Sequence, residues 1–376
     1  MTTEQPTPVL DDLARVQSVD KKNMLRLIGE LPEQCETALG IGRNIALEPL
    51  ATKPNVVLFV GVGDSGLAAD MAAEVLAEEL EAPVVSQHVS RIPPYVGEQS
   101  LVFIVDYSGN SQSAPRAYRE AQQRGAMVVC LTSGGRLREA VTDRRLIVKI
   151  PAGQPSRCAI GYLLLPLVAA VEQLGLASEA VEKASHAVKL LKNIRELFRF
   201  ETPTPRNKAK QIAQALFEKT PVIYGAAGYR ALVARRWKSQ IGANSKAAAY
   251  TGLFPDLMDG ELCAWEQAGE RRGNPTFVFL TDTTDRASEN RALMEAAGEL
   301  LGRFGVIEAQ MGGATTFERM LYGVHLADYV SYYLALMYEV DPMAAESVGF
   351  ISQRLAPPQP ARAPEPETGT DTATEA

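Results

Sequence analysis

Two turns rich in glycine and serine carry the residue types that hold anions in α/β proteins. The first, Gly61-Val62-Gly63-Asp64-Ser65-Gly66, follows the apolar run 56–61, and the second, Ser108-Gly109-Asn110-Ser111, follows the run 101–108. Glycines let a backbone turn sharply, and the N-terminus of the helix that follows presents N–H groups to an anion. By itself the first turn is equally consistent with a dinucleotide-binding fingerprint or a plain tight turn.

The hydroxyls of the second turn have two interpretations. Ser108 and Ser111, together with the helix N-terminus, suit a phosphate held without a lysine. Ser111 equally suits the capping of the helix that follows. A third turn, Thr132-Ser133-Gly134-Gly135, repeats the pattern. Open α/β sheets bind ligands at the carboxyl ends of their strands, so three such turns together favour a phosphosugar over a dinucleotide.

These turns lie within an alternation of apolar runs and helical segments. Runs rich in β-branched residues, typical of parallel strands buried on both faces, lie at 56–61, 83–89, 101–108, 127–132 and 146–150. Helical segments are expected at 66–80, 112–123 and 136–141, and from 161 to about 200 with a break at Gly175. The alternation predicts a doubly wound parallel sheet.

The pattern begins again in the second half. We expect strands at 221–225, 276–282 and 306–311, and helices at 230–250, 286–304 and 316–338. The predicted fold class is α/β, with two doubly wound parallel-sheet domains in tandem at 1–180 and 181–355 and a helical N-terminal segment. The last stretch, 356–376, is rich in Pro, Ala, Thr and Glu without a large apolar residue, and we expect it to be disordered.

Composition argues against several classes of function. The net charge of −7, without a basic stripe, argues against nucleic acid as the main partner. The longest apolar run, 163–171, is well short of the ~20 residues of a membrane span. The four cysteines form no CxxC pair and the three histidines have no metal-ligand spacing, so we expect free thiols and no metal site. The opening residues carry no signal-like segment, and a cytoplasmic location is expected.

Longer segments give a specific resemblance. DKKNMLRLIGELPEQ (20–34), PAGQPSRCAIGY (151–162), RRWKSQ (235–240) and DYVSYYLALMYEVDP (328–342) occur in this order, with the three turns among them. In this order they resemble the bacterial phosphoglucose/phosphomannose isomerases, which have two sugar isomerase (SIS) domains, over about residues 10–355. The resemblance implies interconversion of hexose 6-phosphates by enediol chemistry, no cofactor, and a homodimer with its site near the interface.

The resemblance also assigns residues. It implies that Ser65, Ser108 and Ser111 bind the phosphate and that Arg157 lies in the active site, although Arg157 also suits a surface salt bridge. Three reactive positions of the family differ in this chain: Ala243 stands at the position of the carboxylate base, Asp259 at that of the ring-opening histidine, and Ser352 at that of a C-terminal lysine. Because each acid–base group contributes about 10²–10⁴-fold, little of the parent activity is expected.

Two carboxylates change the phosphate turns as well. Asp106 stands where the family has the first serine of its second turn, and Asp64 replaces a glycine in the first. A carboxylate that faces a phosphate weakens its binding by like-charge repulsion. Glu261 and Glu266 are the candidates for a relocated base, although a structural role suits Glu261 as well. The three histidines, His88, His186 and His325, are expected to pack in the fold or to lie at its surface.

The sequence therefore predicts a protein that binds a phosphorylated hexose or a related carbohydrate derivative, with its isomerase chemistry lost or changed. Two alternatives remain open. One is an active glucose-6-phosphate/mannose-6-phosphate isomerase with relocated catalytic groups, and the other is a structural homodimer without a ligand. No cofactor, metal, nucleic acid or membrane partner is expected.

Overall fold

The computed structural model describes residues 9–88, 91–266, 274–282 and 289–355. The chain divides into two compact units, which are described separately. The first ends at Met343, and the second, which begins at Ala344, is described through its helix α14 (Glu346–Leu355). The tail predicted at 356–376 lies outside the described residues.

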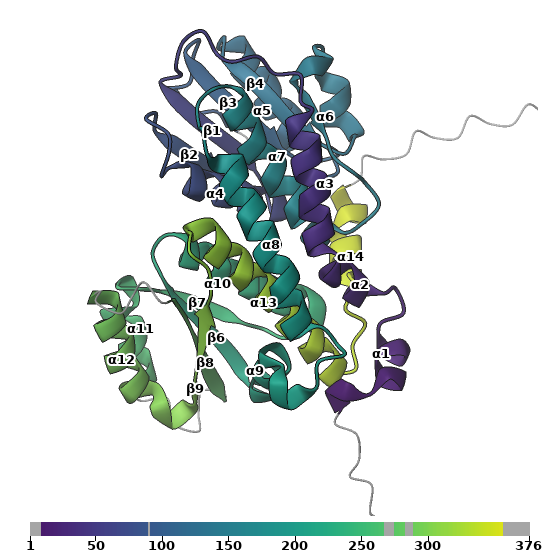
Figure 1. The fold of residues 1–376 in the computed structure, drawn as a ribbon, viewed down its shortest axis with the longest axis vertical. Helices are drawn as coiled ribbons and strands as arrows, with labels where there is room; N and C mark the ends of the chain where they lie inside the picture. Colours follow the sequence, from purple (N-terminus) through teal and green to yellow (C-terminus); the bar gives the residue numbers. More distant parts are fainter. Residues whose placement is uncertain (1–8, 89–90, 267–273, 283–288, 356–376) are drawn as a thin grey trace, which may run out of the picture. The chain divides into compact units, whose positions relative to one another are not determined.

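The first sheet has five parallel strands in the order β2-β1-β3-β4-β5 (Figure 1). They are β1 (Val56–Gly61), β2 (Val84–Gln87), β3 (Ser100–Val105), β4 (Met127–Thr132) and β5 (Ile147–Lys149). Every residue of β1 and β3 is buried, as expected of central strands covered on both faces. Phe59 and Phe103 are register partners, and their rings stack with centroids 4.8 Å apart.

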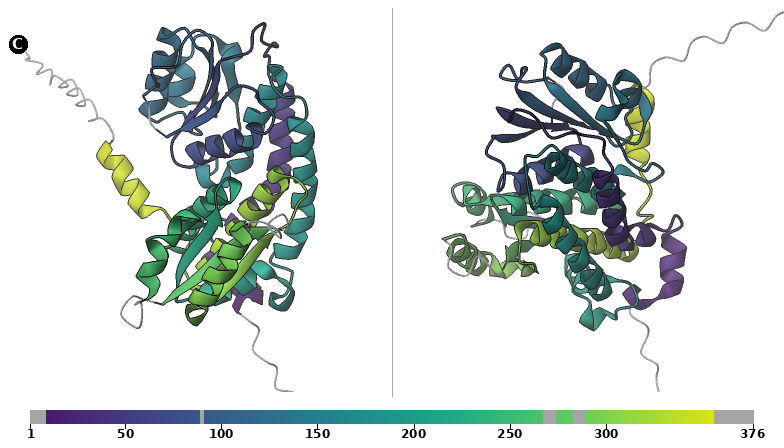
Figure 2. Two further views of the ribbon diagram at one scale, coloured as in Figure 1. Left: turned by 90° about the vertical axis from the view of Figure 1, so that its left-hand side faces the viewer. Right: turned by 45° about the horizontal axis from the view of Figure 1, so that its top comes forward.

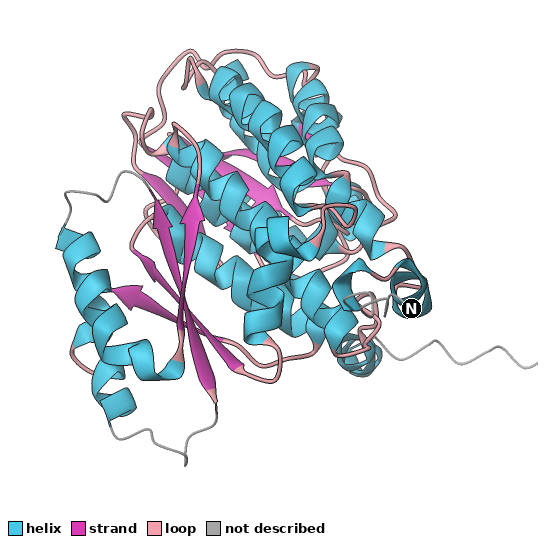
Figure 3. Cartoon of the chain, turned by 60° about the horizontal axis from the view of Figure 1, so that its bottom comes forward, coloured by secondary structure: helices cyan, strands magenta, loops and turns pink. Residues whose placement is uncertain are grey.

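Helices cover both faces of this sheet, which confirms the doubly wound prediction (Figure 3). The helices are α4 (Asp64–Leu76), α5 (Ser113–Gln123), α6 (Gly135–Ala140) and α7 (Ile160–Gln173). On one face α5 and α6 pack with Leu58 and Val102, and on the other α4 and α7 pack with Val57 and Leu101. Neighbouring residues of a strand point to opposite faces, so one apolar run supplies two cores.

A helical segment precedes the first sheet, as predicted. It comprises η1 (Val9–Asp11), α1 (Leu13–Val19), α2 (Met24–Gly29) and α3 (Leu31–Arg43). A Cβ on Gly42 of α3 would lie only 2.3 Å from the Cβ of Ala169, so glycine is required where α3 meets α7. α3 also lies beside α8 (Ala180–Phe198), where Arg195 pairs with Glu33 at 2.7 Å (Figure 2).

The second sheet has four parallel strands in the order β7-β6-β8-β9. They are β6 (Thr220–Ala226), β7 (Tyr250–Phe254), β8 (Pro275–Asp282) and β9 (Val306–Met311). Its helices are α9 (Lys208–Leu216), α10 (Tyr229–Gln240), α11 (Glu261–Glu266), α12 (Glu289–Leu301) and α13 (Thr316–Met337). The side chains of α11 and α12 pack with Val222 and Phe277, and those of α9, α10 and α13 join the core of the opposite face, with Ile223 and Val278.

The prediction of one helix over 230–250 is wrong for the second half of that range. α10 ends at Gln240 and continues as a single π-helical segment, η5 (Ile241–Ser245). Lys246 then takes a left-handed conformation with φ of +59°, and the chain enters the edge strand β7, which the sequence did not predict. The alanine-rich run 247–249 has a high helix propensity, but pairing of β7 with β6 outweighs it. The start of the helix predicted at 286 lies outside the described residues.

One buried apolar cluster connects the two sheets. It includes Phe59 of β1, Leu164 of α7, Tyr329 of α13 and Ile223 of β6. The boundary at residue 180 falls at the start of α8 and stays a prediction. None of the helices within the described ranges is both long enough and apolar enough to cross a membrane.

Candidate functional site

The first turn connects β1 to α4 and depends on glycine. A Cβ on Gly61 would lie 2.8 Å from the backbone of Ser65, so only glycine permits this close turn. Gly63 precedes the helix with φ of +62°. The side chain of Ser65 is buried, and its Oγ accepts a hydrogen bond from the N–H of Tyr107 (3.1 Å) in the second turn. Ser65 therefore holds the first turn against the second.

The carboxylate of Asp106 fills the second turn, which connects β3 to α5. Asp106 follows β3 directly and is 9% exposed. Its Oδ1 accepts hydrogen bonds from the Gly109 N–H (3.0 Å) and the Ser108 hydroxyl (3.3 Å). Its Oδ2 accepts one from the Ser111 N–H (3.0 Å). Backbone N–H groups that converge in this way form a nest for an anion, and here the anion is the chain's own side chain.

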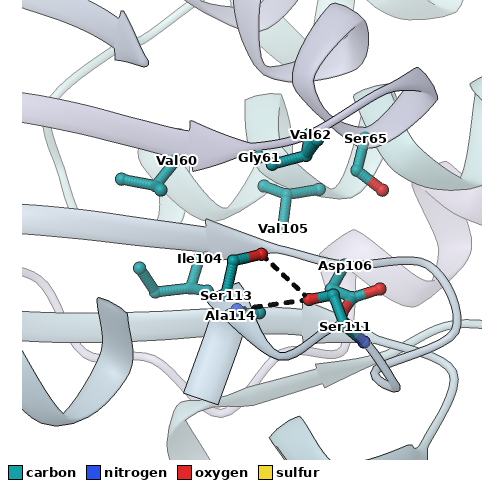
Figure 4. Close-up of a pocket in the computed structure, with 10 residues that line it drawn as sticks. All are labelled: Val60, Gly61, Val62, Ser65, Ile104, Val105, Asp106, Ser111, Ser113 and Ala114. Carbon is teal, nitrogen blue, oxygen red and sulfur yellow. Dashed lines mark hydrogen bonds between the residues drawn. The ribbon is translucent and has the colours of Figure 1, made fainter. Parts of the chain in front are cut away.

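The hydroxyls of the second turn are also engaged locally. Ser108 Oγ accepts a hydrogen bond from the Asn110 N–H (3.1 Å) in addition to its bond to Asp106. Ser111 Oγ accepts bonds from the N–H of Ala114 (3.2 Å) and the hydroxyl of Ser113 (3.3 Å), as Figure 4 shows. Ser111 thus supports the first turn of α5, as the capping interpretation expects. Its hydroxyl accepts in both bonds and can still donate to a phosphate, so its role in phosphate binding stays a prediction.

The third turn interlocks with the second, as the predicted convergence requires. Ser133 Oγ donates to the carbonyl of Tyr107 (2.7 Å). Gly109 has φ of +69°, and a Cβ on it would lie 1.8 Å from the carbonyl oxygen of Gly134. The two turns therefore hold each other in place, and the nest around Asp106 is a rigid feature of the sheet edge.

A small pocket of about 40 Å³ lies where these turns meet. Its polar lining comes from Ser65, Asp106, Ser111 and Ser113 (Figure 4). This volume suits on the order of one or two water molecules. A hexose phosphate would therefore lie at the mouth of the pocket and not within it.

Asp64 points away from this pocket and joins a network with the second domain. Its Oδ2 accepts a hydrogen bond from the Ser156 hydroxyl (2.6 Å), and its Oδ1 lies 3.9 Å from Nη1 of Arg236. Arg236 is fully buried and donates through Nε and Nη2 to the two carboxylate oxygens of Asp328, each at 3.0 Å. Burial raises the pKa of Asp328, and the Arg236 guanidinium opposes that rise. Asp64 is therefore part of an ion network between the domains.

Arg157 lies beside the π-helical segment. Its Nε donates to Oδ1 of Asn244 (3.0 Å), and its Nη2 donates to the carbonyl of Pro342 (2.9 Å). Its own carbonyl accepts a hydrogen bond from Nη2 of Arg236 (2.6 Å). Within the described part of the chain Arg157 forms no ion pair with a carboxylate, so the structure does not support the surface salt bridge. It contacts the segment that carries Ala243, and its place in an active site stays a prediction.

A second cation lies near Arg157. Lys246 Nζ donates to the carbonyl of Ala243 (2.5 Å). The pKa of Lys246 is lowered, mainly because its ammonium group is partly desolvated and also because the Arg157 guanidinium repels it. The Ala243 side chain itself has no acid–base group. This part of the site can attract an anion, but residue 243 cannot remove a proton from a sugar carbon.

Glu261 and Glu266 lie at another part of the second domain. Glu261 Oε1 accepts a hydrogen bond from the Tyr224 hydroxyl (2.8 Å) and lines a pocket of about 420 Å³ that Arg235 also lines. Arg235, at this pocket, and Asn244, which bonds to Arg157, are nine residues apart, which is roughly 10–15 Å along a helix. The pocket therefore lies at a distance from Arg157. Glu266 and Asp259 are exposed. Among the described residues, no hydrogen bond or ion pair links either glutamate to Arg157, Asn244 and Lys246, the three residues called the Arg157 cluster below. Ser352 lies in the second compact unit, and its position relative to the site is not described.

The histidines take structural places, as expected. His88 Nε2 lies 2.8 Å from Oδ2 of Asp70, His186 is exposed on α8, and His325 is fully buried in α13. Burial lowers the pKa of His325 to about 3, and the charge of Arg195 contributes. Within the described ranges no group of three or more His, Cys, Asp and Glu side chains is arranged to hold a metal ion.

The sequence analysis missed a second carboxylate at a strand end. Asp282 ends β8, is almost fully buried and accepts a hydrogen bond from the Tyr229 hydroxyl. Arg230 Nη1 and Arg319 Nε lie 3.7 and 3.6 Å from its Oδ2. Strand β8 is central in its sheet, as β3 is in the first, so Asp106 and Asp282 both lie at the carboxyl end of a central strand. They face different layers, because Asp282 contacts α10 and α13, whereas Asp106 bonds to the turn that leads into α5.

Comparisons with known proteins agree with this architecture. The family described as SIS domain matches residues 51–176, and the family described as bacterial phospho-glucose isomerase C-terminal SIS domain matches residues 205–355. A glucose-6-phosphate isomerase like protein from Thermus thermophilus has a similar fold, with a TM-score of 0.57 at 20% identity, covering 89% of this chain and 94% of that one.

Curated relatives extend over nearly the whole chain. The bifunctional phosphoglucose/phosphomannose isomerase of Caldicellulosiruptor bescii is 32% identical over 336 residues, which are 89% of this chain and 99% of the relative. The protein of the same description from Aquifex aeolicus is 29% identical over 303 residues, 80% of this chain and 90% of the relative. With two parallel SIS-type sheets and this length of similarity, the chain belongs to the bifunctional phosphoglucose/phosphomannose isomerase family.

Proposed function

We propose that this protein binds a phosphorylated hexose or a related carbohydrate derivative and does not isomerise it. The observation that carries the proposal is the arrangement around η5. Arg157 is bonded to Asn244, Lys246 lies near it, and the adjacent residue is Ala243. Cations are present to attract a sugar derivative, whereas the position expected to hold the base has only a methyl group.

Isomerisation needs a base above the two carbons that exchange a proton, and an acid–base group near the ring oxygen. The described residues around Arg157 supply amide, hydroxyl and cationic groups, from Asn244, Ser331, Gln240 and Lys246. They also include the carboxylate of Asp341, whose charge acts on Lys246 and whose Oδ1 accepts a hydrogen bond from the Met343 N–H (2.8 Å). Asp328 is nearby, but Arg236 and Gln240 hold both of its oxygens in the buried network. Each lost acid–base group costs about 10²–10⁴-fold, so binding without turnover follows.

An active isomerase remains the second candidate because of one observation. Glu261 lines a pocket of about 420 Å³ with Arg235 and Asp256, which is large enough for part of a sugar. For this candidate a second copy of the chain would have to bring Glu261 to the Arg157 cluster. The homodimer that this requires, and the cytoplasmic location, are predictions from the family.

A ligand-free structural role is favoured by a different observation, the occupation of the second turn by Asp106. If no sugar binds, the two-domain architecture would serve assembly alone. The three candidates make different predictions for two simple measurements.

The test combines a coupled isomerase assay with fructose 6-phosphate and thermal-shift titration with hexose phosphates and hexoses. We expect stabilisation without turnover, and we expect Arg157→Ala to lose that stabilisation. Arg145→Ala, which removes an exposed arginine paired with Asp143, is the matched control and should respond as the wild type does. Turnover of roughly 1–10³ per second would overturn the proposal in favour of the active enzyme. The absence of both responses would leave the structural role.

A further inference from the structure

The pocket at the first two turns has an unusual electrostatic property: its strongest anion-binding groups are already used. Three donors converge on Asp106, namely the N–H groups of Gly109 and Ser111 and the hydroxyl of Ser108, at 3.0, 3.0 and 3.3 Å. Oriented backbone N–H groups of this kind attract phosphate and carboxylate groups in the same way. The nest therefore has an occupant that belongs to the chain.

The occupant is held in place by the surrounding turns. Asp106 follows a fully buried strand, and its own N–H donates to the carbonyl of Leu131 in β4 (3.1 Å). The close contact of Gly109 with Gly134 fixes the part of the turn that supplies one of the donors. Asp106 lines the pocket of about 40 Å³, so a rotation of its side chain out of the nest and into this pocket would bring it against any ligand there.

A phosphate at this turn would therefore meet two obstacles. It would find its donors bonded to another anion, and it would lie close to a negative charge in a partly buried turn, where like charges repel more strongly than in water. A neutral hydroxyl would meet neither obstacle, because it can donate to the carboxylate. An ammonium group would be attracted to it.

We propose that Asp106 is a specificity-determining residue that excludes phosphate from the β3–α5 turn. The ligand at this pocket is then a carbohydrate derivative that places an uncharged hydroxyl or a cationic amino group there. This inference rests on the proposed function, and it narrows the ligand class to derivatives without a phosphate at this position. Any anionic group of the ligand would face Arg157 and Lys246 instead.

The experiment measures affinity by calorimetry for four probes: inorganic phosphate, glucose 6-phosphate, glucose and glucosamine. The proteins are the wild type, Asp106→Ser, Asp106→Asn and the control Asp143→Ser. Asp143 also accepts a hydrogen bond from a backbone N–H, that of Arg145 (3.0 Å), but lies in a different loop. Circular dichroism and a thermal melt establish that each variant is folded.

We expect Asp106→Ser to gain affinity for inorganic phosphate and glucose 6-phosphate by about tenfold or more, because it removes the charge and empties the nest. Asp106→Asn removes the charge but keeps the volume, and should gain less. Affinity for glucose should stay within about twofold, affinity for glucosamine should fall, and Asp143→Ser should match the wild type.

The outcomes separate this inference from the proposed function. If the wild type binds both phosphate probes as tightly as Asp106→Ser does, Asp106 does not exclude phosphate and the inference is overturned, while the proposed function stands. If Asp106→Ser gains affinity for inorganic phosphate and no protein binds any sugar, the role of Asp106 is supported and the proposed function fails.

Discussion

The two sheets end their central strands with the same residue type in opposite surroundings. Asp106 after β3 is held by backbone N–H groups and a serine hydroxyl beside a small open pocket. Asp282 at the end of β8 is held by a tyrosine hydroxyl with two arginine side chains near it, and only 1% of its side chain is exposed. The first arrangement places a carboxylate beside a pocket, and the second places a carboxylate in the core between β8, α10 and α13.

The difference shows what each domain contributes. In the first domain, small residues in three turns keep the backbone close to the pocket, so its donors are part of the main chain. In the second domain, the charge of Asp282 is compensated by the side chains of Arg230 and Arg319. We therefore expect substitution of the strand-end carboxylate to change ligand binding in the first domain and to lower the stability of the fold in the second.

The largest expected effect is on Asp282. Asp282→Asn removes a buried negative charge beside Arg230 and Arg319, so we expect a loss of about 3–5 kcal/mol in the free energy of unfolding. Urea denaturation at neutral pH measures it. A loss no larger than that of Asp106→Asn would mean that Asp282 is not part of a buried ionic cluster, and would contradict the difference between the two carboxylates.

The next effect concerns acid stability in the second domain. His325 is fully buried, neither ring nitrogen has a hydrogen-bond partner in the described structure, and its pKa is lowered to about 3. The unfolded value is about 6.5, so the unfolded chain takes up the proton first. The contribution of His325 is therefore complete above pH 6.5 and is lost as the pH falls toward 3.

At pH 4 this linkage should cost about 3 kcal/mol of unfolding free energy relative to pH 7. His325→Leu removes the titrating group. Between pH 7 and pH 4, the unfolding free energy of this variant should therefore fall by about 3 kcal/mol less than that of the wild type. Urea titrations at pH 7 and pH 4 give the comparison, with His186→Gln, at an exposed position, as the control. Parallel losses in the wild type and His325→Leu would contradict the assignment.

A smaller effect is expected at the first strand end. Asp106→Asn should cost only about 1 kcal/mol, because its lost hydrogen bonds are replaced in part by water in the adjoining pocket. The same urea experiment measures the difference from Asp282→Asn. A loss above about 3 kcal/mol would mean that Asp106 is a structural element like Asp282, and that emptying the nest is not compatible with a stable turn.

The sequence predicted the central strands and the three turns well, because each depends on residues that are close together in the chain. β1 and β3 are continuous apolar runs, and their turns carry glycines where the backbone requires them. β7 was missed because it is a short edge strand with alternating burial, preceded by an alanine run of high helix propensity.

The site itself depended on contacts between distant residues. Arg157 meets Asn244, and Arg236 meets Asp328, across 87 and 92 positions of sequence. No local pattern predicts these pairs. The orientation of Asp106 had a local signal, since an aspartate ahead of Ser-Gly-Asn commonly bonds to the backbone of its own turn. Asp64 had none, because its partners Ser156 and Arg236 come from other segments.

The smallest expected effects concern two hydroxyls that begin helices, one in each domain. Ser111 Oγ accepts from the Ala114 N–H at the start of α5, and Thr315 Oγ1 accepts from the Glu318 N–H at the start of α13, each at 3.2 Å. Replacement of either residue by alanine should cost about 0.5–1 kcal/mol. If Ser111 serves only the helix, Ser111→Ala and Thr315→Ala should lose similar stability in urea and leave sugar binding unchanged. A loss of sugar affinity in Ser111→Ala alone would show that this hydroxyl contacts the ligand, and the first strand end would then bind through side chains as well as backbone.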